Sequence, residues 1–183
     1  MKFKLDTSWS LFLDRDGVIN EKLKNDYVKN WDQFCFKVGA LEALAELRKV
    51  FGHIFIVTNQ RGVGLGKMTE EELNVIHANM LFAIDEAFGK IDKVYYCVDT
   101  DNSSFNRKPN IGMGLLAKQD FPEIDFSRSI MVGDSISDME FGEKLGMKCI
   151  FINSNFDCEN ELEYLMFNSL LEFKNSLKVG QFS

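Results

Sequence analysis

The stretch Leu11-Phe12-Leu13-Asp14-Arg15-Asp16-Gly17-Val18-Ile19-Asn20 joins a short apolar run to two aspartates that are separated by a single residue. An apolar run of this length, residues 9–13, is typical of a buried strand in a parallel sheet, and ligands of open α/β sheets bind beyond the carboxyl ends of such strands. Gly17 lets the chain turn there, so the side chains of Asp14 and Asp16 can converge on one point. Two converging carboxylates can hold Mg²⁺, or can act as nucleophile and acid. The alternative is a turn with two solvated aspartates, because the pattern Asp-x-Asp is common.

A second apolar run, residues 53–57, ends at Thr58 and is followed by the polar, glycine-rich segment Asn59-Gln60-Arg61-Gly62-Val63-Gly64. Such a segment can present backbone N–H groups to an anion, which gives this strand end the character of a phosphate site. Further along the chain, the pair Arg107-Lys108 precedes a proline that stiffens the turn. A lysine at this position can neutralise a phosphoryl group.

A third apolar run, residues 129–132, leads into Gly133-Asp134-Ser135-Ile136-Ser137-Asp138. This segment adds the carboxylates of Asp134 and Asp138 where a strand gives way to a helix. Four acidic residues, one hydroxyl group and one lysine therefore lie at predicted strand ends, where ligands of such sheets bind.

Apolar runs alternate with helical patterns along the whole chain. We predict strands at about residues 9–13, 53–57, 93–97, 129–132 and 148–152. We predict helices at about residues 40–49, 69–88, 111–119, 136–145 and 159–177. This alternation predicts an α/β fold with a doubly wound parallel sheet that helices cover on both faces. Nothing in the sequence marks a linker, so residues 1–183 are expected to form one domain.

The helix expected over residues 69–88 has the clearest pattern. Thr69 and Glu72 have the spacing of a capping box, and Gly89 can end the helix. The apolar stripes of this helix and of the last one are expected to be buried against the sheet. The two stripes consist of Leu73, Ile76, Met80, Ile84 and Ala87, and of Leu162, Leu165, Met166, Leu170, Phe173 and Leu177.

The composition favours a soluble protein with a sizeable core, because 45% of the 183 residues are hydrophobic and 27% are charged. No apolar run approaches the length of a membrane span, and residues 1–6 lack the apolar stretch of a signal peptide. We therefore expect a cytoplasmic protein without a membrane partner. The net charge of −7 weighs against nucleic acid as a partner. The cysteines, which are expected to be reduced core thiols, are Cys35, Cys97, Cys149 and Cys158.

Four motifs resemble, in this order, those of the haloacid dehalogenase (HAD) superfamily of phosphohydrolases: Asp14-Arg15-Asp16-Gly17, Thr58, Lys108, and Gly133-Asp134 with Asp138. The sequence around them is similar to that of the histidinol phosphatases and the D-glycero-D-manno-heptose-1,7-bisphosphate 7-phosphatases. The resemblance covers about residues 9–153 and implies a Rossmann-like HAD core.

The resemblance implies a role for each motif residue. Asp14 would be the nucleophile that forms an aspartyl-phosphate, and Asp16 would protonate the leaving alkoxide and then deprotonate the attacking water. Thr58 and backbone N–H groups near Asn59 would hold the phosphoryl oxygens, while Lys108 would balance their charge.

Mg²⁺ is the implied cofactor, with Asp14, the carbonyl group of Asp16 and Asp134 as its ligands. Two roles are open for Asp138. It can orient Lys108 or bind a metal-bound water, or it can simply favour the N-terminal end of a helix dipole.

No insertion is long enough for a cap domain, so the site is expected to be open and the substrate to be a small phosphorylated molecule. Specificity would then come from three short loops at residues 21–27, 61–67 and 98–106. Arg107 would bind a second anionic group, unless it is a solvated surface arginine. The chain is expected to be a monomer or a weak homo-oligomer. The residues expected to bind substrate are Asn59, Gln60, Arg61 and Arg107.

One loop departs from the closer relatives. They carry a zinc loop of the form Cys-x-His followed by Cys-x-Cys, whereas here only Cys97 remains, and Asp99, Ser104 and Asn106 stand at the other positions. One thiol cannot close a structural zinc site, so no zinc is expected. Side chains such as Asp99 or Ser104 would hold the loop by bonding nearby backbone N–H groups.

These observations predict a Mg²⁺-dependent phosphomonoesterase for a sugar phosphate or bisphosphate of the heptose bisphosphate type. Leu65 and Ser135 stand where heptose phosphatases often carry cations, which weakens this substrate assignment and leaves histidinol phosphate as an alternative. A phospho-receiver module is a second class, but receivers place their aspartate on a middle strand, and no suitable strand-end aspartate lies between Thr58 and Asp99. A non-catalytic binding protein is a third class, against which the complete motif set argues. We assign no catalytic role to His53 or His77.

Overall fold

The computed structural model describes residues 5–152 and 164–177. Within these ranges six strands form one parallel sheet in the order β3-β2-β1-β4-β5-β6. The strands are β1 (Ser10–Leu13), β2 (His53–Asn59), β3 (Lys93–Cys97), β4 (Ser129–Gly133), β5 (Lys148–Ile152) and β6 (Leu165–Phe167). The helices are α1 (Ala40–Leu47), α2 (Arg61–Gly64), α3 (Glu70–Glu86), α4 (Gly112–Asp120), α5 (Ile136–Lys144) and α6 (Leu170–Ser176), with two single-turn 3₁₀ helices, η1 (Trp31–Gln33) and η2 (Phe126–Arg128).

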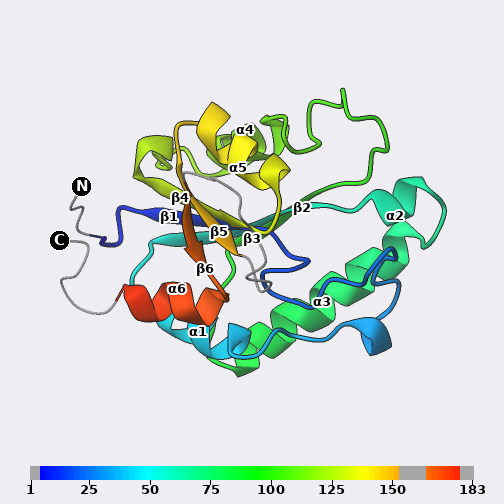
Figure 1. The fold of residues 1–183 in the computed structure, drawn as a ribbon, viewed down its shortest axis with the longest axis horizontal. Coiled ribbons are helices and arrows are strands. Elements are labelled where there is room, and N and C mark those ends of the chain that lie inside the picture. Colours follow the sequence, from blue (N-terminus) through cyan, green and yellow to red (C-terminus); the bar gives the residue numbers. More distant parts are fainter. Residues whose placement is uncertain (1–4, 153–163, 178–183) are drawn as a thin grey trace.

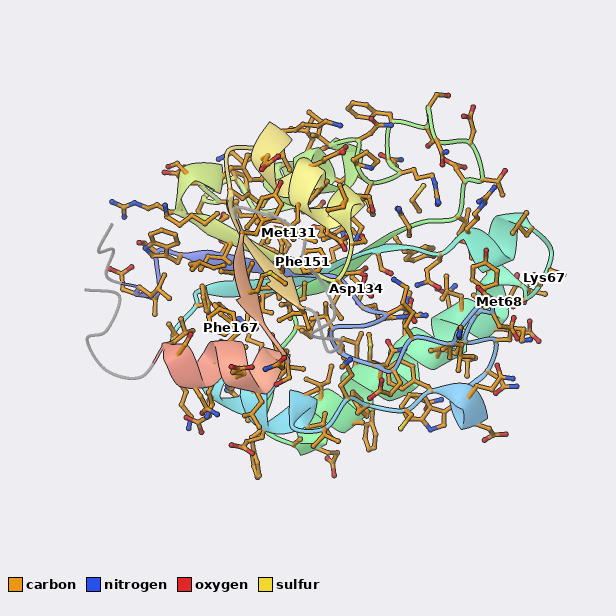
Figure 2. The ribbon with its side chains drawn as sticks, in the orientation of Figure 1. Lys67, Met68, Met131, Asp134, Phe151 and Phe167 are labelled. Carbon is orange, nitrogen blue, oxygen red and sulfur yellow. The ribbon has the colours of Figure 1, made fainter. Side chains whose placement is uncertain are left out.

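Helices cover both faces of the sheet, with α1, α3 and α6 on one side and α4 and α5 on the other (Figure 1). The hydrophobic core has two parts, one on each face of the sheet. The strands contribute side chains to both parts, because successive side chains of a strand point to opposite faces. Leu11 and Leu13 are buried in the core on the α1, α3 and α6 side. Phe12 packs 5.1 Å from the ring of Phe55 in the other core, which also contains Met131 (Figure 2). The doubly wound α/β fold predicted from the sequence is confirmed.

Strand β1 lies at the centre of the sheet and aligns three strand ends. Leu13, its last residue, pairs in register with Ile56 of β2 and Val132 of β4. The backbone N–H of Asp14 still donates to the carbonyl oxygen of Val132, at 2.9 Å. The residues that follow these strands therefore emerge side by side at one edge of the sheet.

The prediction of the last helix is wrong for residues 165–167, which form a strand. Within the range 159–177, residues 165–167 form the edge strand β6, and the helix begins only at Leu170. The open edge of β5 pairs with this short apolar run, and the Ser169 side chain caps α6 by accepting from the Glu172 N–H. Phe167 packs 5.6 Å from the ring of Phe173 in α6 (Figure 2). Leu165 and Met166, predicted to be core residues, are exposed, and Leu162 lies outside the described residues.

Helix α3 confirms its predicted capping box. Thr69 Oγ1 accepts from the Glu72 N–H at 3.1 Å, and Glu72 Oε2 accepts from the Thr69 N–H at 2.8 Å. Its end differs from the prediction, because Phe88, with a φ of 61°, takes the left-handed position that was expected of Gly89. The predicted stripe residues that are buried are Leu73, Ile76, Met80 and Ile84.

The segment between β1 and α1 contains one single-turn helix, η1, and no helical layer over the strand ends. Residues 61–64, expected to be part of a loop, form the short helix α2. Of the cysteines, Cys97 is buried and Cys149 half-buried, but Cys35 is exposed, so its prediction as a core thiol is wrong. Cys158 lies outside the described residues. None of the helices described in residues 5–152 and 164–177 has the length and apolar character of a membrane span.

Candidate active site

The carboxyl ends of β1, β2 and β4 open into a cavity of about 210 Å³. It unites residues from all four sequence motifs. The predicted site residues in its lining are Asp14, Asp16, Thr58, Asn59, Lys108, Asp134 and Asp138, and Lys22, Ser135 and Ser137 complete it.

Gly17 is required for this convergence, for two reasons. Its φ is 96°, a backbone conformation that residues other than glycine rarely adopt. A Cβ atom at this position would also lie 2.1 Å from Oδ2 of Asp134. The turn after β1 can therefore approach the end of β4 only because residue 17 lacks a side chain.

Lys108 lies at the floor of the cavity with its side chain almost fully buried. Its Nζ donates to Asp14 Oδ1 at 2.9 Å, to Asp138 Oδ1 at 2.5 Å and to the Val57 carbonyl oxygen at 2.6 Å. Burial lowers the pKa of this amine, but the two carboxylates outweigh burial and raise the pKa above its ordinary value. Three acceptors use all three N–H donors, so Lys108 is a fixed positive charge.

Two carboxylates of the cavity are destabilised in their charged form. Burial is the main reason that the pKa of Asp14 rises to about 7; the charge of Lys108 opposes this rise, and the charges of Asp138, Asp134 and Asp16 add to it. Burial likewise raises the pKa of Asp134. A bound cation would relieve this electrostatic stress.

Asp138 combines two of the roles that the sequence left open. One carboxylate oxygen holds Lys108, and the other accepts from the backbone N–H groups of Asp134 and Ser135 and from the Ser135 hydroxyl group, at 3.2, 3.1 and 2.6 Å. Asp138 is thus the N3 residue of the capping box of α5 and also orients the lysine. Its carboxylate lies near those of Asp14 and Asp134, with one oxygen of each within 4.8 Å of the others.

The carboxylate of Asp16 is bonded to three donors, which come from Arg15, Asn20 and Gln60. Arg15 Nη2 lies 3.0 Å from Oδ1 and 2.9 Å from Oδ2, Asn20 Nδ2 donates at 2.9 Å, and Gln60 Nε2 donates at 2.8 Å. Burial raises the pKa of Asp16, but Arg15 and the hydrogen bonds hold it below its ordinary value. Gln60 Nε2 also donates to Thr58 Oγ1 at 2.9 Å, so this side chain joins Asp16 to Thr58, and the binding of substrate by Gln60 stays a prediction.

Asn59 is paired with the backbone of Lys108. Its Oδ1 accepts from the Lys108 N–H and its Nδ2 donates to the Lys108 carbonyl oxygen, both at 3.0 Å. This pair joins the third motif to the end of β2 and fixes the lysine against the cavity floor.

Comparison with known proteins agrees with this arrangement. A family model described as HAD-hydrolase-like matches residues 105–172. Over 169 residues the chain is 36% identical to a D-glycero-alpha-D-manno-heptose-1,7-bisphosphate 7-phosphatase of Mycobacterium bovis, an alignment that covers 90% of this chain and 89% of that protein. The chain belongs to the HAD family of phosphatases.

Other members of the family extend the likeness along the chain. A D-glycero-beta-D-manno-heptose-1,7-bisphosphate 7-phosphatase of Escherichia coli K12 is 32% identical over 185 residues, covering 94% of this chain and 95% of that protein. A solved D,D-heptose 1,7-bisphosphate phosphatase from B. bronchiseptica, complexed with magnesium and phosphate, superimposes with a TM-score of 0.81 at 25% identity. That superposition covers 92% of this HAD phosphatase and 97% of its relative.

Lys22 is a site residue of this HAD phosphatase that the sequence analysis did not identify. Its Nζ lies 3.0 and 2.8 Å from the two carboxylate oxygens of Asp134. Burial lowers its pKa, but Asp134 and the neighbouring aspartates outweigh burial and raise it. The loop at residues 21–27 was expected to contribute to specificity, and a basic residue so close to the first motif was the available signal.

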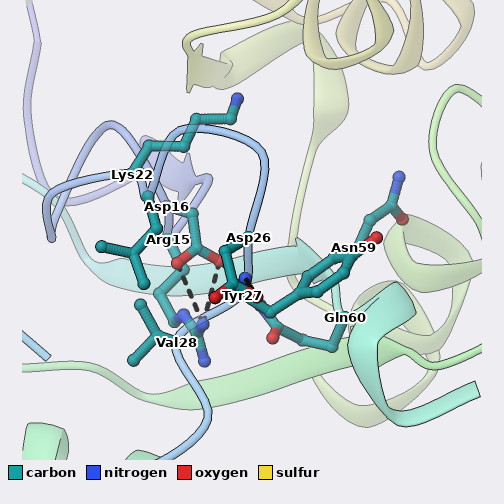
Figure 3. A pocket seen from close by; sticks show the side chains of 9 residues that line it. Arg15, Asp16, Lys22, Asp26, Tyr27, Val28, Asn59 and Gln60 are labelled. Atoms are coloured by element: carbon teal, nitrogen blue, oxygen red, sulfur yellow. Dashed lines mark hydrogen bonds and ion pairs between the residues drawn. The ribbon is translucent and has the colours of Figure 1, made fainter. Parts of the chain in front are cut away.

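A second cavity of about 130 Å³ adjoins the first and shares Asp16, Lys22 and Asn59 with it (Figure 3). The loop after β1 forms one wall of it, and the end of β2 forms the other. Its remaining lining residues are Arg15, Leu23, Asp26, Tyr27, Val28 and Gln60.

The two arginines that were expected to bind substrate, Arg61 and Arg107, are not among the residues that line these two cavities of the HAD phosphatase. Arg61 is exposed at the start of α2. Arg107 donates from Nε to Asn102 Oδ1 and from Nη1 to the Asp99 carbonyl oxygen, both at 3.2 Å. These contacts brace the loop at residues 98–106, and the binding of an anion by Arg107 stays a prediction.

The loop that lacks zinc ligands is held by side chains. Asp99 Oδ2 accepts from the hydroxyl group of Ser104 and from the Cys97 thiol, the latter at 3.5 Å. The prediction that Asp99 or Ser104 would bond backbone N–H groups is wrong for these contacts, because their partners are side chains. Asp101 makes the predicted kind of bond instead, with the Ser103 N–H at 2.8 Å.

Proposed function

We propose that this HAD phosphatase hydrolyses one phosphomonoester of a small sugar bisphosphate of the heptose bisphosphate kind, using Mg²⁺ and an aspartyl-phosphate intermediate. One observation carries the proposal: Asp14 Oδ1 lies 2.9 Å from Nζ of the buried Lys108. A carboxylate can attack a dianionic phosphoryl group only where cations offset the repulsion. The names of the relatives support a sugar bisphosphate as the substrate class.

The residues present fit a magnesium ion, because the clustered ligand atoms of Asp14, Asp134 and Asp138 are all carboxylate oxygens. We assign the ion to Asp14, the carbonyl group of Asp16 and Asp134, since Asp138 is already bonded to Lys108 and to the start of α5. Bound there, Mg²⁺ would neutralise phosphoryl oxygens and orient the phosphoryl group toward Asp14.

In the first step, a carboxylate oxygen of Asp14 attacks the phosphorus atom and the bond from phosphorus to the substrate oxygen breaks. Asp16 gives its proton to the departing alkoxide. A dianionic phosphoryl group beside Asp16 favours the protonated acid that this step needs, against the pull of Arg15. Thr58 Oγ1 accepts from Gln60, so its own O–H is free to donate to a phosphoryl oxygen.

In the second step, Asp16 removes a proton from a water molecule whose oxygen attacks the phosphorus atom. The bond between phosphorus and Asp14 breaks, inorganic phosphate leaves, and both carboxyl groups return to their starting states.

We place the sugar in the second cavity, because it shares Asp16, the proposed acid, with the first. Tyr27 offers an aromatic face, the carboxylate of Asp26 can accept hydrogen bonds from sugar hydroxyl groups, and Lys22 lies at the border between the cavities. A sugar that carries a further phosphate suits this combination of polar and aromatic groups.

The test is phosphate release from a panel containing both anomers of heptose 1,7-bisphosphate, the matching monophosphates and histidinol phosphate, with Mg²⁺ and with EDTA. We expect release from a bisphosphate, loss of activity in EDTA and recovery with Mg²⁺. A higher kcat/KM for histidinol phosphate would contradict the substrate class. Full activity in metal-free protein would contradict the metal site.

A further inference from the structure

Arg15 lies between the candidate acid–base residue and helix α3. Its side chain is 1% exposed, and its Nη2 lies 3.0 and 2.9 Å from the two oxygens of Asp16. Its Nη1 lies 3.1 Å from Nε2 of His77, in the second turn of α3. Figure 3 shows the Arg15 and Asp16 side chains facing each other in the lining of the second cavity.

The direction of the bond to His77 is fixed by chemistry. The guanidinium group is always protonated and can only donate, so His77 Nε2 must be the unprotonated acceptor. The imidazole is therefore neutral, with its proton on Nδ1. Burial, with the charge of Arg15, lowers the pKa of His77 to about 3, in agreement with a neutral ring.

Among the described residues, Nη1 of Arg15 is bonded to His77, and Nε of Arg15 is buried with no hydrogen-bond partner. Without an acceptor at position 77, two buried donor atoms of one guanidinium group would be unsatisfied. Such groups reorient or draw in water, because an unmade buried hydrogen bond is costly. The position of Arg15 against Asp16 thus depends on a side chain with no access to the cavity.

His77 is carried by helix α3, which is capped at its start and buried along one face. Helix α3 begins with a complete capping box, and Ile76 and Met80, on either side of His77, are fully buried. The ring of His77 also packs 5.4 Å from that of Tyr96. The other two donors to Asp16, Asn20 and Gln60, come from loop positions.

We propose that His77 is a positioning residue, which acts through Arg15 to orient the carboxyl group of Asp16 toward the leaving group. This inference rests on the proposed role of Asp16 as the acid. It assigns His77 no contact with substrate or metal.

The experiment compares two substrates that differ in their need for an acid. When the bond to phosphorus breaks, the sugar departs as an alkoxide that must be protonated, whereas p-nitrophenyl phosphate releases a phenolate that needs no proton. The comparison uses kcat/KM, which reports the steps up to departure of the leaving group and not the later hydrolysis of the aspartyl-phosphate, where Asp16 acts on both substrates alike. For His77→Leu we expect kcat/KM on the sugar phosphate to fall by about 10- to 100-fold, and kcat/KM on p-nitrophenyl phosphate to change by less than about threefold. His77→Gln, whose side-chain oxygen can accept from Nη1, should restore most of the loss.

Two controls separate positioning from general damage. Met80→Ala removes buried volume from the same helix without touching Arg15, so it should affect both substrates equally. Asp16→Asn should show the same substrate discrimination in kcat/KM as His77→Leu, but more strongly, while its kcat falls on both substrates because the base of the second step is lost. If Asp16→Asn does not discriminate, the proposed acid is wrong; if it does and His77→Leu does not, only the present inference is overturned.

A spectroscopic measurement tests the geometry even if His77→Leu fails to fold. The chain has two histidines, so a His53→Gln variant assigns their ¹⁵N signals. We expect His77 to show the Nδ1–H tautomer and no titration between about pH 5 and 9. An Nε2–H tautomer or a titrating ring would overturn the inference.

Discussion

The ammonium group of Lys22 lies 2.8 Å from Oδ2 and 3.0 Å from Oδ1 of Asp134, a carboxylate that we assign to the magnesium site. The Lys22 side chain is 55% exposed, whereas that of Asp134 is 15% exposed. A loop residue thus neutralises a largely buried carboxylate that a metal ion would also neutralise.

We therefore expect Lys22→Gln to bind Mg²⁺ more tightly than the natural protein. The gain should be modest, about two- to fivefold in Kd, because a half-exposed ion pair contributes at most about 1 kcal/mol. Titration calorimetry measures it directly. Lys24→Gln is the matched control, since it removes the same charge from an exposed position of the same loop and should leave Kd unchanged. Equal or weaker binding by Lys22→Gln would show that Lys22 does not compete with the metal.

Asp14→Asn should abolish turnover, with a loss on the order of 10⁴ or more, because an amide cannot form the acyl phosphate. The fold should survive, with a melting temperature equal to or above that of the natural protein. The reason is that the charged carboxylate is disfavoured where it is buried, as its raised pKa of about 7 indicates. Steady-state kinetics and thermal denaturation check the two parts. Normal turnover by this variant would remove Asp14 as the nucleophile.

The stability of the metal-free protein should fall as the pH rises from about 4 to about 7. The pKa of Asp14 is raised from 3.8 to about 7 in the folded state, so in this window the folded protein binds more protons than the unfolded chain. The free energy of unfolding, measured by urea denaturation, should lose part of this slope in Asp14→Asn. Added Mg²⁺ should raise the melting temperature more at pH 8 than at pH 5.5. A stabilisation by Mg²⁺ that is independent of pH would contradict the coupling.

The purified protein should contain no stoichiometric zinc. A structural zinc site needs four nitrogen or sulfur ligands, and the loop at residues 98–106 is held by the bonds of Asp99 to Ser104 and Cys97. Elemental analysis measures the metal content. About one zinc per chain, lost in Cys97→Ser, would overturn this prediction.

Local patterns were sufficient to predict most of the fold. The five apolar runs became β1 to β5, and the spacing of Thr69 and Glu72 became a capping box. Local patterns failed for residues 165–167, where the open edge of β5 decided that the chain would be a strand. A short apolar run is compatible with a helix or a strand, and only its neighbours in space choose between them.

The sequence by itself determined which residues gather at the site, because Asp14, Thr58 and Asp134 lie at the carboxyl ends of strands and such ends meet at one edge of a parallel sheet. Only the tertiary structure decided how they are bonded. Arg15 meets His77 across 62 positions of the chain, and Gln60 meets Asp16 across 44. A hydrogen bond requires the separation of two groups to be correct within a few tenths of an ångström, and local patterns do not relate groups so far apart in the chain. Only tertiary packing could therefore turn Gln60 toward Asp16 and His77 toward Arg15.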